Sequence, residues 1–262
     1  MSYVSNVLTH WVGRGRSPED QYTLITQSIL RKRELLYSPS RWHFKSKYGG
    51  VQNFDIMMVS FADIPFSECA VHCEDFSHFG LSFDKTYLAN CLASPVGYVQ
   101  QPFIYQNYVY IYHVLQGMKS VLDGTDIPEG AKKGTKFDSQ AVLQRFQYIM
   151  CFLENHSEDE FKYNEPPAKT PLPDQEHFFE NRSSLYYQRE WRMVLSSSGR
   201  GFPWHVTRDG KTYFKFEAQY LKWVIVPREY VRRLRDEHAC IFNDYPIGSI
   251  PVILAYEDLE FF

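Results

Sequence analysis

The sequence places strand-forming segments at both ends of a chain of 262 residues and helical patterns between them. Segments of this kind are rich in β-branched and aromatic residues. They are VLTHWVG (7–13), IMMVSFADIPF (56–66), HFGLSFDK (78–85), VGYVQQP (96–102), LYYQREWRMVL (185–195), TYFKFEAQ (212–219), LKWVIVP (221–227) and PVILAYED (251–258). Because strands must pair to satisfy their backbone groups, we expect the two ends of the chain to share one sheet in an α+β fold.

The clearest helix is predicted directly after the first strand. Ser17, Pro18 and Asp20 supply an N-cap hydroxyl, a proline at the first helical position and a carboxylate near the positive end of the helix dipole. Apolar residues then recur at helical spacing, which predicts a helix from about Pro18 to Leu36. A loop rich in Ser, Lys and Gly is expected to follow it, through Gly50.

The middle of the chain predicts two further helices, at 105–122 and 138–156. A proline-rich polar stretch at 164–175 indicates a surface loop, and a short helix at Arg228–His238 separates the last two strands. We therefore expect a single domain over residues 1–262 with a helical insertion at about 103–160.

Composition excludes several broad classes of protein. A hydrophobic content of 44% with 17% aromatic residues is typical of a packed domain and not of a disordered chain. A net charge of −3 argues against binding nucleic acid by bulk charge, although a local basic groove remains compatible with it. The sequence has no long apolar run, no signal peptide and five scattered cysteines, so we expect a cytoplasmic protein outside the membrane.

The stretch YYQREWRMVL carries charged residues in the middle of a predicted strand. Because side chains two positions apart share a face of a strand, Gln188, Glu190 and Arg192 are expected on one face and Arg189 on the other. Such a row of polar groups is either a solvated ladder of ion pairs or a prepared polar site. The sequence of this stretch alone leaves both alternatives open.

Four segments, in this order, resemble the AbiGi-type family associated with abortive phage infection. They are LTHWVGR, MVSFADIPFSECAVH, FGLSFDKTYL with ASPVGYV, and YYQREWRMVL, and they span about residues 7–195. In that family a His-containing strand, a Cys-Phe-Thr-Asp-Ile-Pro-like segment, a Gly-Phe/Ile strand with a basic residue after it, and Glu-Trp-Arg recur in this order. This chain has Val-Ser-Phe-Ala-Asp in the second segment, so no chemistry of that Cys or Thr can be carried over.

The same layout is similar to the ADP-ribosyltransferase fold, a split mixed or antiparallel sheet with flanking helices, in particular its DarT-like branch. This resemblance implies that His10, with Thr9 beside it, binds the adenosine-side ribose of NAD. It also implies that Ser60 or Phe61 flanks the nicotinamide and that Glu190 is catalytic.

Further roles follow from the same resemblance. Gln188, two residues before the glutamate, would help to select the acceptor. Guanidinium groups suit pyrophosphate, so Arg192 and the pair Arg14 and Arg16 are candidate cofactor-binding groups. A solvated loop is the alternative for Arg14 and Arg16. The positive charge that builds on the ribose when the nicotinamide bond breaks would be stabilised by the Glu190 carboxylate.

The resemblance thus implies an NAD-dependent ADP-ribosyltransferase toxin or effector of anti-phage defence. Its acceptor would be a macromolecule, with nucleic acid, possibly RNA, favoured over protein, and an antitoxin protein would neutralise it. The alternative is a non-catalytic antitoxin or regulatory binding module of an abortive-infection system, and hydrolysis of NAD by water is a third. Placement of His10 and Glu190 on opposite faces of the sheet would exclude the enzyme hypothesis.

Two other patterns carry weaker expectations. Cys69, His72, Cys73 and His78 lie close together, but their spacing fits no familiar zinc site, so no metal is expected. The helix REYVRRLRDEH (228–238) carries four arginines, which are either a solvated face or a contact for phosphates.

Overall fold

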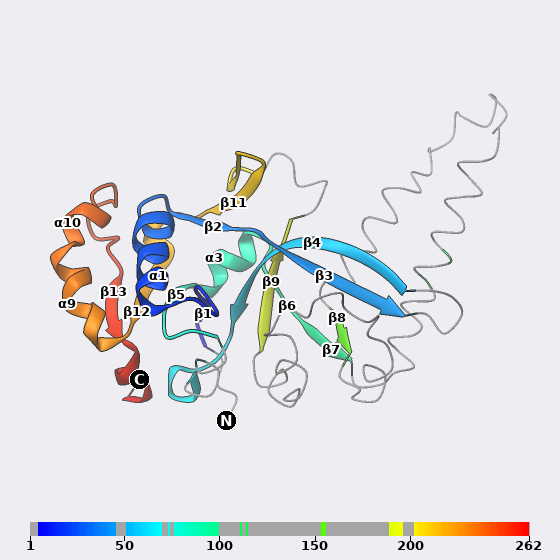
Figure 1. The fold of residues 1–262 in the computed structure, drawn as a ribbon, viewed down its shortest axis with the longest axis horizontal. Helices are drawn as coiled ribbons and strands as arrows, with labels where there is room; N and C mark the ends of the chain where they lie inside the picture. Colours follow the sequence, from blue (N-terminus) through cyan, green and yellow to red (C-terminus); the bar gives the residue numbers. More distant parts are fainter. Residues whose placement is uncertain are drawn as a thin grey trace.

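The computed structural model describes residues 5–45, 51–69, 73, 76–99, 111, 114, 153–155, 189–195 and 202–261. In this part of the chain the main sheet has eight strands (Figure 1). Seven lie side by side in the order β13, β12, β5, β1, β4, β9 and β6, and β3 also pairs with β4. The strands are β1 Val7–Trp11, β3 Ser38–Lys45, β4 Val51–Ala62, β5 Gly80–Asp84, β6 Ser94–Pro95, β9 Glu190–Val194, β12 Leu221–Val226 and β13 Val252–Ala255.

The first strand lies inside this sheet and the last strand lies at one edge of it. β1 is antiparallel to both of its neighbours, β4 and β5, whereas β12 and β13 are parallel to each other. The two ends of the chain therefore share a sheet, as predicted. The described residues form a mixed fold of strands and short helices.

Two smaller sheets accompany the main one. β10 (His205–Arg208), β11 (Lys211–Lys215) and β2 (Glu34–Leu36) form a three-stranded antiparallel sheet in that order. β7 (Gly97–Val99) pairs in parallel with β8 (Leu153–Asn155). β8 falls within the stretch expected to form the second central helix, so the helical prediction was wrong for residues 153–155, and residues 138–152 lie outside the described part of the chain. Most of the expected insertion at 103–160, like the loop at 164–175, lies outside the described residues.

The described helices are short. They are α1 Pro18–Thr23, α3 Lys85–Asn90, α9 Arg228–Asp236 and α10 His238–Ile241, with a π-helical segment η1 Leu24–Leu30 and the 3-10 turns η2 Phe66–Glu68, η4 Ala218–Tyr220 and η5 Tyr256–Phe261. None of the helices in the described ranges is long and apolar enough to cross a membrane.

The first helix begins where the sequence predicts but ends earlier. Ser17 Oγ accepts a hydrogen bond from the backbone N–H of Asp20, and Pro18 occupies the first helical position. The helical conformation ends at Leu30, and the predicted stretch to Leu36 was wrong. The next residues form β2, which pairs with β11, and β3 replaces the expected loop at 38–45. Pairing with a strand far along the chain overrides the local helical pattern.

Both faces of the main sheet are covered by side chains. Leu8, Phe61 and Phe83 belong to the larger buried core, which also takes in residues of α1 and η1. Ala62 belongs to a smaller core together with Ile225 and other residues. Since Phe61 and Ala62 are consecutive in β4, their side chains point to opposite faces. The larger and smaller cores thus lie on the two sides of one sheet.

The backbone of Gly80 in β5 lies close to the indole ring of Trp11 in β1. Gly80 pairs with Trp11, and a Cβ atom added at Gly80 would lie 2.9 Å from two carbons of the Trp11 indole. Real Cβ contacts are essentially never this short. Only glycine therefore fits between the two strands without a shift of the indole.

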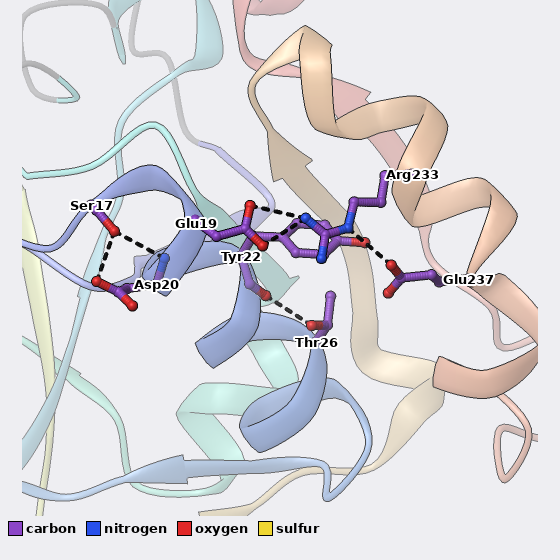
Figure 2. A network of polar contacts seen from close by, with 7 residues as sticks. All are labelled: Ser17, Glu19, Asp20, Tyr22, Thr26, Arg233 and Glu237. Carbon is purple, nitrogen blue, oxygen red and sulfur yellow. Dashed lines mark hydrogen bonds and ion pairs between the residues drawn. The ribbon is translucent and has the colours of Figure 1, made fainter.

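A polar network joins the first helix to α9 (Figure 2). Arg233 Nη1 donates to both carboxylate oxygens of Glu19, at 2.7 and 2.9 Å, and Arg233 Nε donates to Glu237 at 3.0 Å. The guanidinium lies over the ring of Tyr22, 4.3 Å from its centroid. Tyr22 in turn stacks on Tyr230 of α9, with ring centroids 5.1 Å apart. The network connects segments more than two hundred residues apart in the chain.

Candidate functional site

The four segments that resemble the AbiGi-type family converge on neighbouring strands. β5, β1, β4 and β9 lie next to one another in the sheet. Thr9 of β1 is paired with Ala62 of β4, and Ala62 is paired with Glu190 of β9. Since directly paired residues share a face, Thr9, Ala62 and Glu190 form one row on the face of the smaller core.

Glu190 and Arg192 form a two-pronged ion pair on this face. Arg192 Nε donates to Glu190 Oε1 at 2.8 Å, and Arg192 Nη2 donates to Oε2 at 2.7 Å. The side chain of Arg192 is only 4% exposed and that of Glu190 only 14%. The prediction that these two residues share a face is confirmed. The pair is largely buried, so the expected alternative of a solvated ladder was wrong for these two residues.

The strand that carries the pair is shorter than predicted. β9 begins at Glu190, and the preceding Arg189 has a φ of 41°, outside the extended conformation. The strict alternation of faces therefore does not continue back through Arg189. Gln188, the expected acceptor-selecting residue, lies outside the described residues.

His10 lies on the opposite face of the sheet. It follows Thr9 in β1, and its ring contacts Phe61 edge-on, with centroids 5.9 Å apart. Phe61 is paired with Trp191, not with Glu190. His10 and Phe61 thus contact each other on the side of the larger core, and their implied roles in binding NAD remain predictions.

The imidazole of His10 is held by the backbone. Its Nδ1 lies 2.8 Å from the carbonyl oxygen of Ser60. Burial lowers the pKa of His10 below its usual value, and the contact with the carbonyl only partly offsets this. The neutral ring therefore donates Nδ1–H to Ser60, which leaves Nε2 as the acceptor nitrogen.

The proposed catalytic arrangement is not assembled. His10 and Glu190 lie on opposite faces of the sheet, and the carboxylate of Glu190 is already bound by Arg192 on both oxygens. A single substrate in one pocket could not contact both groups. The expectation that these two residues act together was wrong, because the register between β1, β4 and β9 sets their faces and the sequence does not reveal that register.

The remaining predicted residues have varied surroundings. Thr9 is 3% exposed, and its hydroxyl lies 2.8 Å from that of Ser82, which is fully buried. The guanidinium of Arg14 lies 5.0 Å from the ring centroid of Phe76, and Arg16 is exposed in the same loop. Thr9 therefore has a packing role between β1 and β5. For Arg14 and Arg16 the location agrees with the alternative of a surface loop.

The sequence analysis did not predict a second charged cluster, which is formed by Lys85, Asp63 and the ring of Trp191. Lys85 Nζ, at the start of α3, lies 2.6 Å from Asp63 Oδ2 and 5.0 Å from the ring centroid of Trp191. Asp63 follows β4, two residues after Phe61, and its N–H donates to the carbonyl of Arg189 at 3.1 Å. The other carboxylate oxygen of Asp63 is buried and accepts no hydrogen bond from the residues that the structure describes.

A signal for this cluster was present in the sequence. The Asp of FADIP, the basic residue after the GLSFD strand and the Trp of EWR belong to three of the recurring segments, and the structure brings all three together. A cation over an indole and beside a carboxylate stabilises the packing of β4, β9 and α3. The recurring segments thus explain a structural junction better than they explain a catalytic triad.

In the described ranges no group of three or more His, Cys, Asp or Glu side chains is placed to hold a metal ion. Cys69 and Cys73 are buried and free, and His72 lies outside the described residues. A neighbouring thiol of Cys69 and burial raise the pKa of Cys73. The Cys73 thiol is therefore protonated at neutral pH.

Comparison with protein families identifies the chain. Residues 40–224 match the family model of the putative abortive phage resistance protein AbiGi, antitoxin. The chain belongs to the AbiGi family. The AbiGi match covers more than half of the chain and includes β4, β5 and β9, so the AbiGi-type resemblance of the sequence is confirmed. No curated protein and no solved structure matches the chain.

The AbiGi description corrects the functional expectation. The family is described as an antitoxin, whereas the sequence led us to expect an NAD-dependent ADP-ribosyltransferase toxin that needs an antitoxin. The toxin hypothesis was therefore wrong, and the alternative of an antitoxin fits the AbiGi family. The DarT-like resemblance, NAD binding and a nucleic-acid or protein acceptor remain predictions.

Proposed function

We propose that this protein is a non-catalytic antitoxin, a binding module that neutralises a toxin in an abortive-infection system. The observation that carries the proposal is the match over residues 40–224 to a family described as an antitoxin. The geometry supports the non-catalytic part. His10 and Glu190 face opposite sides of the sheet, and both Glu190 oxygens are bound by Arg192.

Neutralisation by binding needs a stable surface more than a reactive group. The polar residues of the central strands have the character of structural groups, because each of them binds a neighbouring polar side chain. Glu190 is bound to Arg192, Thr9 to Ser82 and Asp63 to Lys85. In this proposal the partner is a protein toxin.

Co-expression tests the proposal. The chain is expressed alone, and then together with the protein encoded by the gene next to its own, after that neighbour has been shown to arrest growth by itself. We expect normal growth with the chain alone and restored growth with both. Growth arrest by the chain alone, or no rescue of any toxic neighbour, would contradict the antitoxin role.

A labelling experiment tests the non-catalytic part separately. The purified chain is incubated with labelled NAD and with separate pools of RNA, DNA and protein, beside the matched variant Glu190→Gln. We expect no transfer of label with either protein. Transfer of label by the original chain would sink the non-catalytic proposal, and a loss of transfer in a Glu190→Gln protein shown to be folded would assign a catalytic role to Glu190.

A further inference from the structure

The main sheet has one open edge next to α9. β13 is the terminal strand, and in the part of the chain that the structure describes it pairs with β12 alone. Figure 1 shows β13 at the outer end of the sheet, beside α9 and α10. The outer side of this strand therefore presents backbone N–H and C=O groups without a strand partner. Such an edge can accept an added strand from another chain.

A cleft of about 620 Å³ lies between β13 and α9. Leu254 and Ala255 of β13 line one part of it, and Arg228, Arg232 and Arg235 of α9 line another. An extended peptide placed along β13 would therefore lie beside three guanidinium groups. The cleft combines the hydrogen-bonding edge with a row of positive charges.

The arginines of α9 differ in how far they are already bound. Arg228 is paired with Asp258, which also lines the cleft. Arg232 is 93% exposed and only 3.8 Å from Asp236 at its nearest, a weak exposed pair. Arg235 is exposed and forms no ion pair with any described residue. Positive charge is therefore available in the cleft for an acidic ligand.

The beginning of the strand and the residues before it carry exposed apolar side chains. Val252, the first residue of β13, is 56% exposed, and Ile250 just before it is 44% exposed. Ile247 in the preceding loop is fully exposed. Proteins usually protect a free strand edge with charged residues, and apolar side chains beside such an edge favour contact with another protein.

We propose that β13 is a docking strand for an extended acidic segment of a protein partner. The segment would pair with the outer edge of β13, direct its carboxylates toward Arg232 and Arg235, and cover Ile250 and Val252. This inference rests on the proposed antitoxin function, in which the partner is the toxin. It names the surface and the chemistry of the segment that the surface recognises.

Two other occupants fit the observations less well. A second copy of this chain, paired edge to edge, would bring a second set of α9 arginines toward the first, and like charges oppose that. Nucleic acid could contact the arginines, but its sugar-phosphate backbone cannot pair with the free edge of a strand. An acidic polypeptide satisfies both the charges and the free backbone groups.

A peptide-binding experiment tests the docking strand directly. The probe is a fluorescent octapeptide of alternating Val and Glu, compared with a Val–Lys octapeptide and with a Val–Glu octapeptide methylated on alternate backbone nitrogens. Fluorescence anisotropy is measured for the full chain, for Arg232→Glu/Arg235→Glu, and for the matched control Arg31→Glu/Lys211→Glu. Arg31 and Lys211 are exposed and do not line the cleft.

We expect the Val–Glu peptide to bind about tenfold more tightly than either comparison peptide. The cleft variant should weaken its binding by about tenfold, and the control variant should not. Equal binding of the three peptides, or equal loss in both variants, would overturn the proposal. Self-association of the chain through this edge would also overturn the proposal. So would an RNA oligonucleotide that displaces the peptide from the original chain and does not bind the cleft variant.

The co-expression assay separates this inference from the proposed function. If the original chain and the cleft variant rescue growth equally, the docking strand does not bind the toxin, but the antitoxin role stands. If the original chain fails to rescue growth while the peptide binds as expected, the antitoxin role fails and the docking strand stands. Circular dichroism of each variant confirms that the fold is retained.

Discussion

Replacing Glu190 by glutamine is expected to destabilise the fold, because it removes the carboxylate that binds the buried guanidinium of Arg192 with both oxygens. Arg192 is 4% exposed at its side chain and donates to both oxygens of Glu190 at 2.7–2.8 Å. A glutamine of the same shape would present an N–H₂ group to one of these donors. The substitution therefore removes the negative charge. It also places the amide N–H₂ donor of the glutamine against an N–H donor of Arg192.

The magnitude follows from the burial of the pair. Removing one partner of a buried ion pair costs about 3–5 kcal/mol, and the slight exposure of Glu190 places this case at the lower end, about 3 kcal/mol. For a chain of this size each kcal/mol lowers the midpoint of thermal unfolding by about 2–4 °C. We therefore expect the midpoint of Glu190→Gln to fall by about 6–12 °C.

Two further variants make the measurement decisive. Glu68→Gln, at an exposed glutamate, is the matched control and should change stability by less than about 0.5 kcal/mol. The double variant Glu190→Gln/Arg192→Met removes both charges, so it should recover much of the loss, since buried pairs are replaced by apolar residues at little cost. Scanning calorimetry measures all four proteins. A midpoint for Glu190→Gln equal to that of the control would refute a structural role for the pair.

Three further predictions concern stability. His10 has a lowered pKa, so acidification from about pH 6.5 downward protonates the unfolded state first and destabilises the fold by up to about 1.4 kcal/mol per pH unit. In the His10→Gln variant, the free energy of unfolding measured in urea should depend less steeply on pH. The same pH dependence in the variant and the original chain would contradict this. Gly80→Ala should cost about 1–3 kcal/mol in urea unfolding by crowding Trp11, and Trp11→Leu in the same chain should recover part of that. Arg233→Gln should lower the thermal midpoint more than Arg232→Gln, and the difference should shrink as salt rises.

Local signals in the sequence predicted local structure well. The start of α1 depends on Ser17 and Pro18 and on nothing distant, and it was placed correctly. The end of the same helix was wrong, because Leu35, which is 1% exposed, is held by pairing with Phe214 of β11. That partner lies far along the chain, and no local pattern reveals it.

The candidate site was limited by the same cause. The alternation of Glu190 and Arg192 on one face follows from strand geometry, and the structure has it. Whether His10 shares that face depends on the pairing of Thr9 with Ala62 and of Ala62 with Glu190. A register shifted by one residue would move His10 to the other face. The sequence therefore identified the strands that meet, but not the faces that their side chains share.

The position of β1 bears on how a shortened form of the protein would behave. The family match begins at residue 40, but the strand that joins β4 to β5 comes from residues 7–11. A fragment restricted to residues 40–224 would lack this strand and would expose the facing edges of β4 and β5. Open edges of this kind promote aggregation. A boundary drawn from sequence similarity alone would thus split the sheet through its middle, and the N-terminal strand must be retained for the remainder to fold.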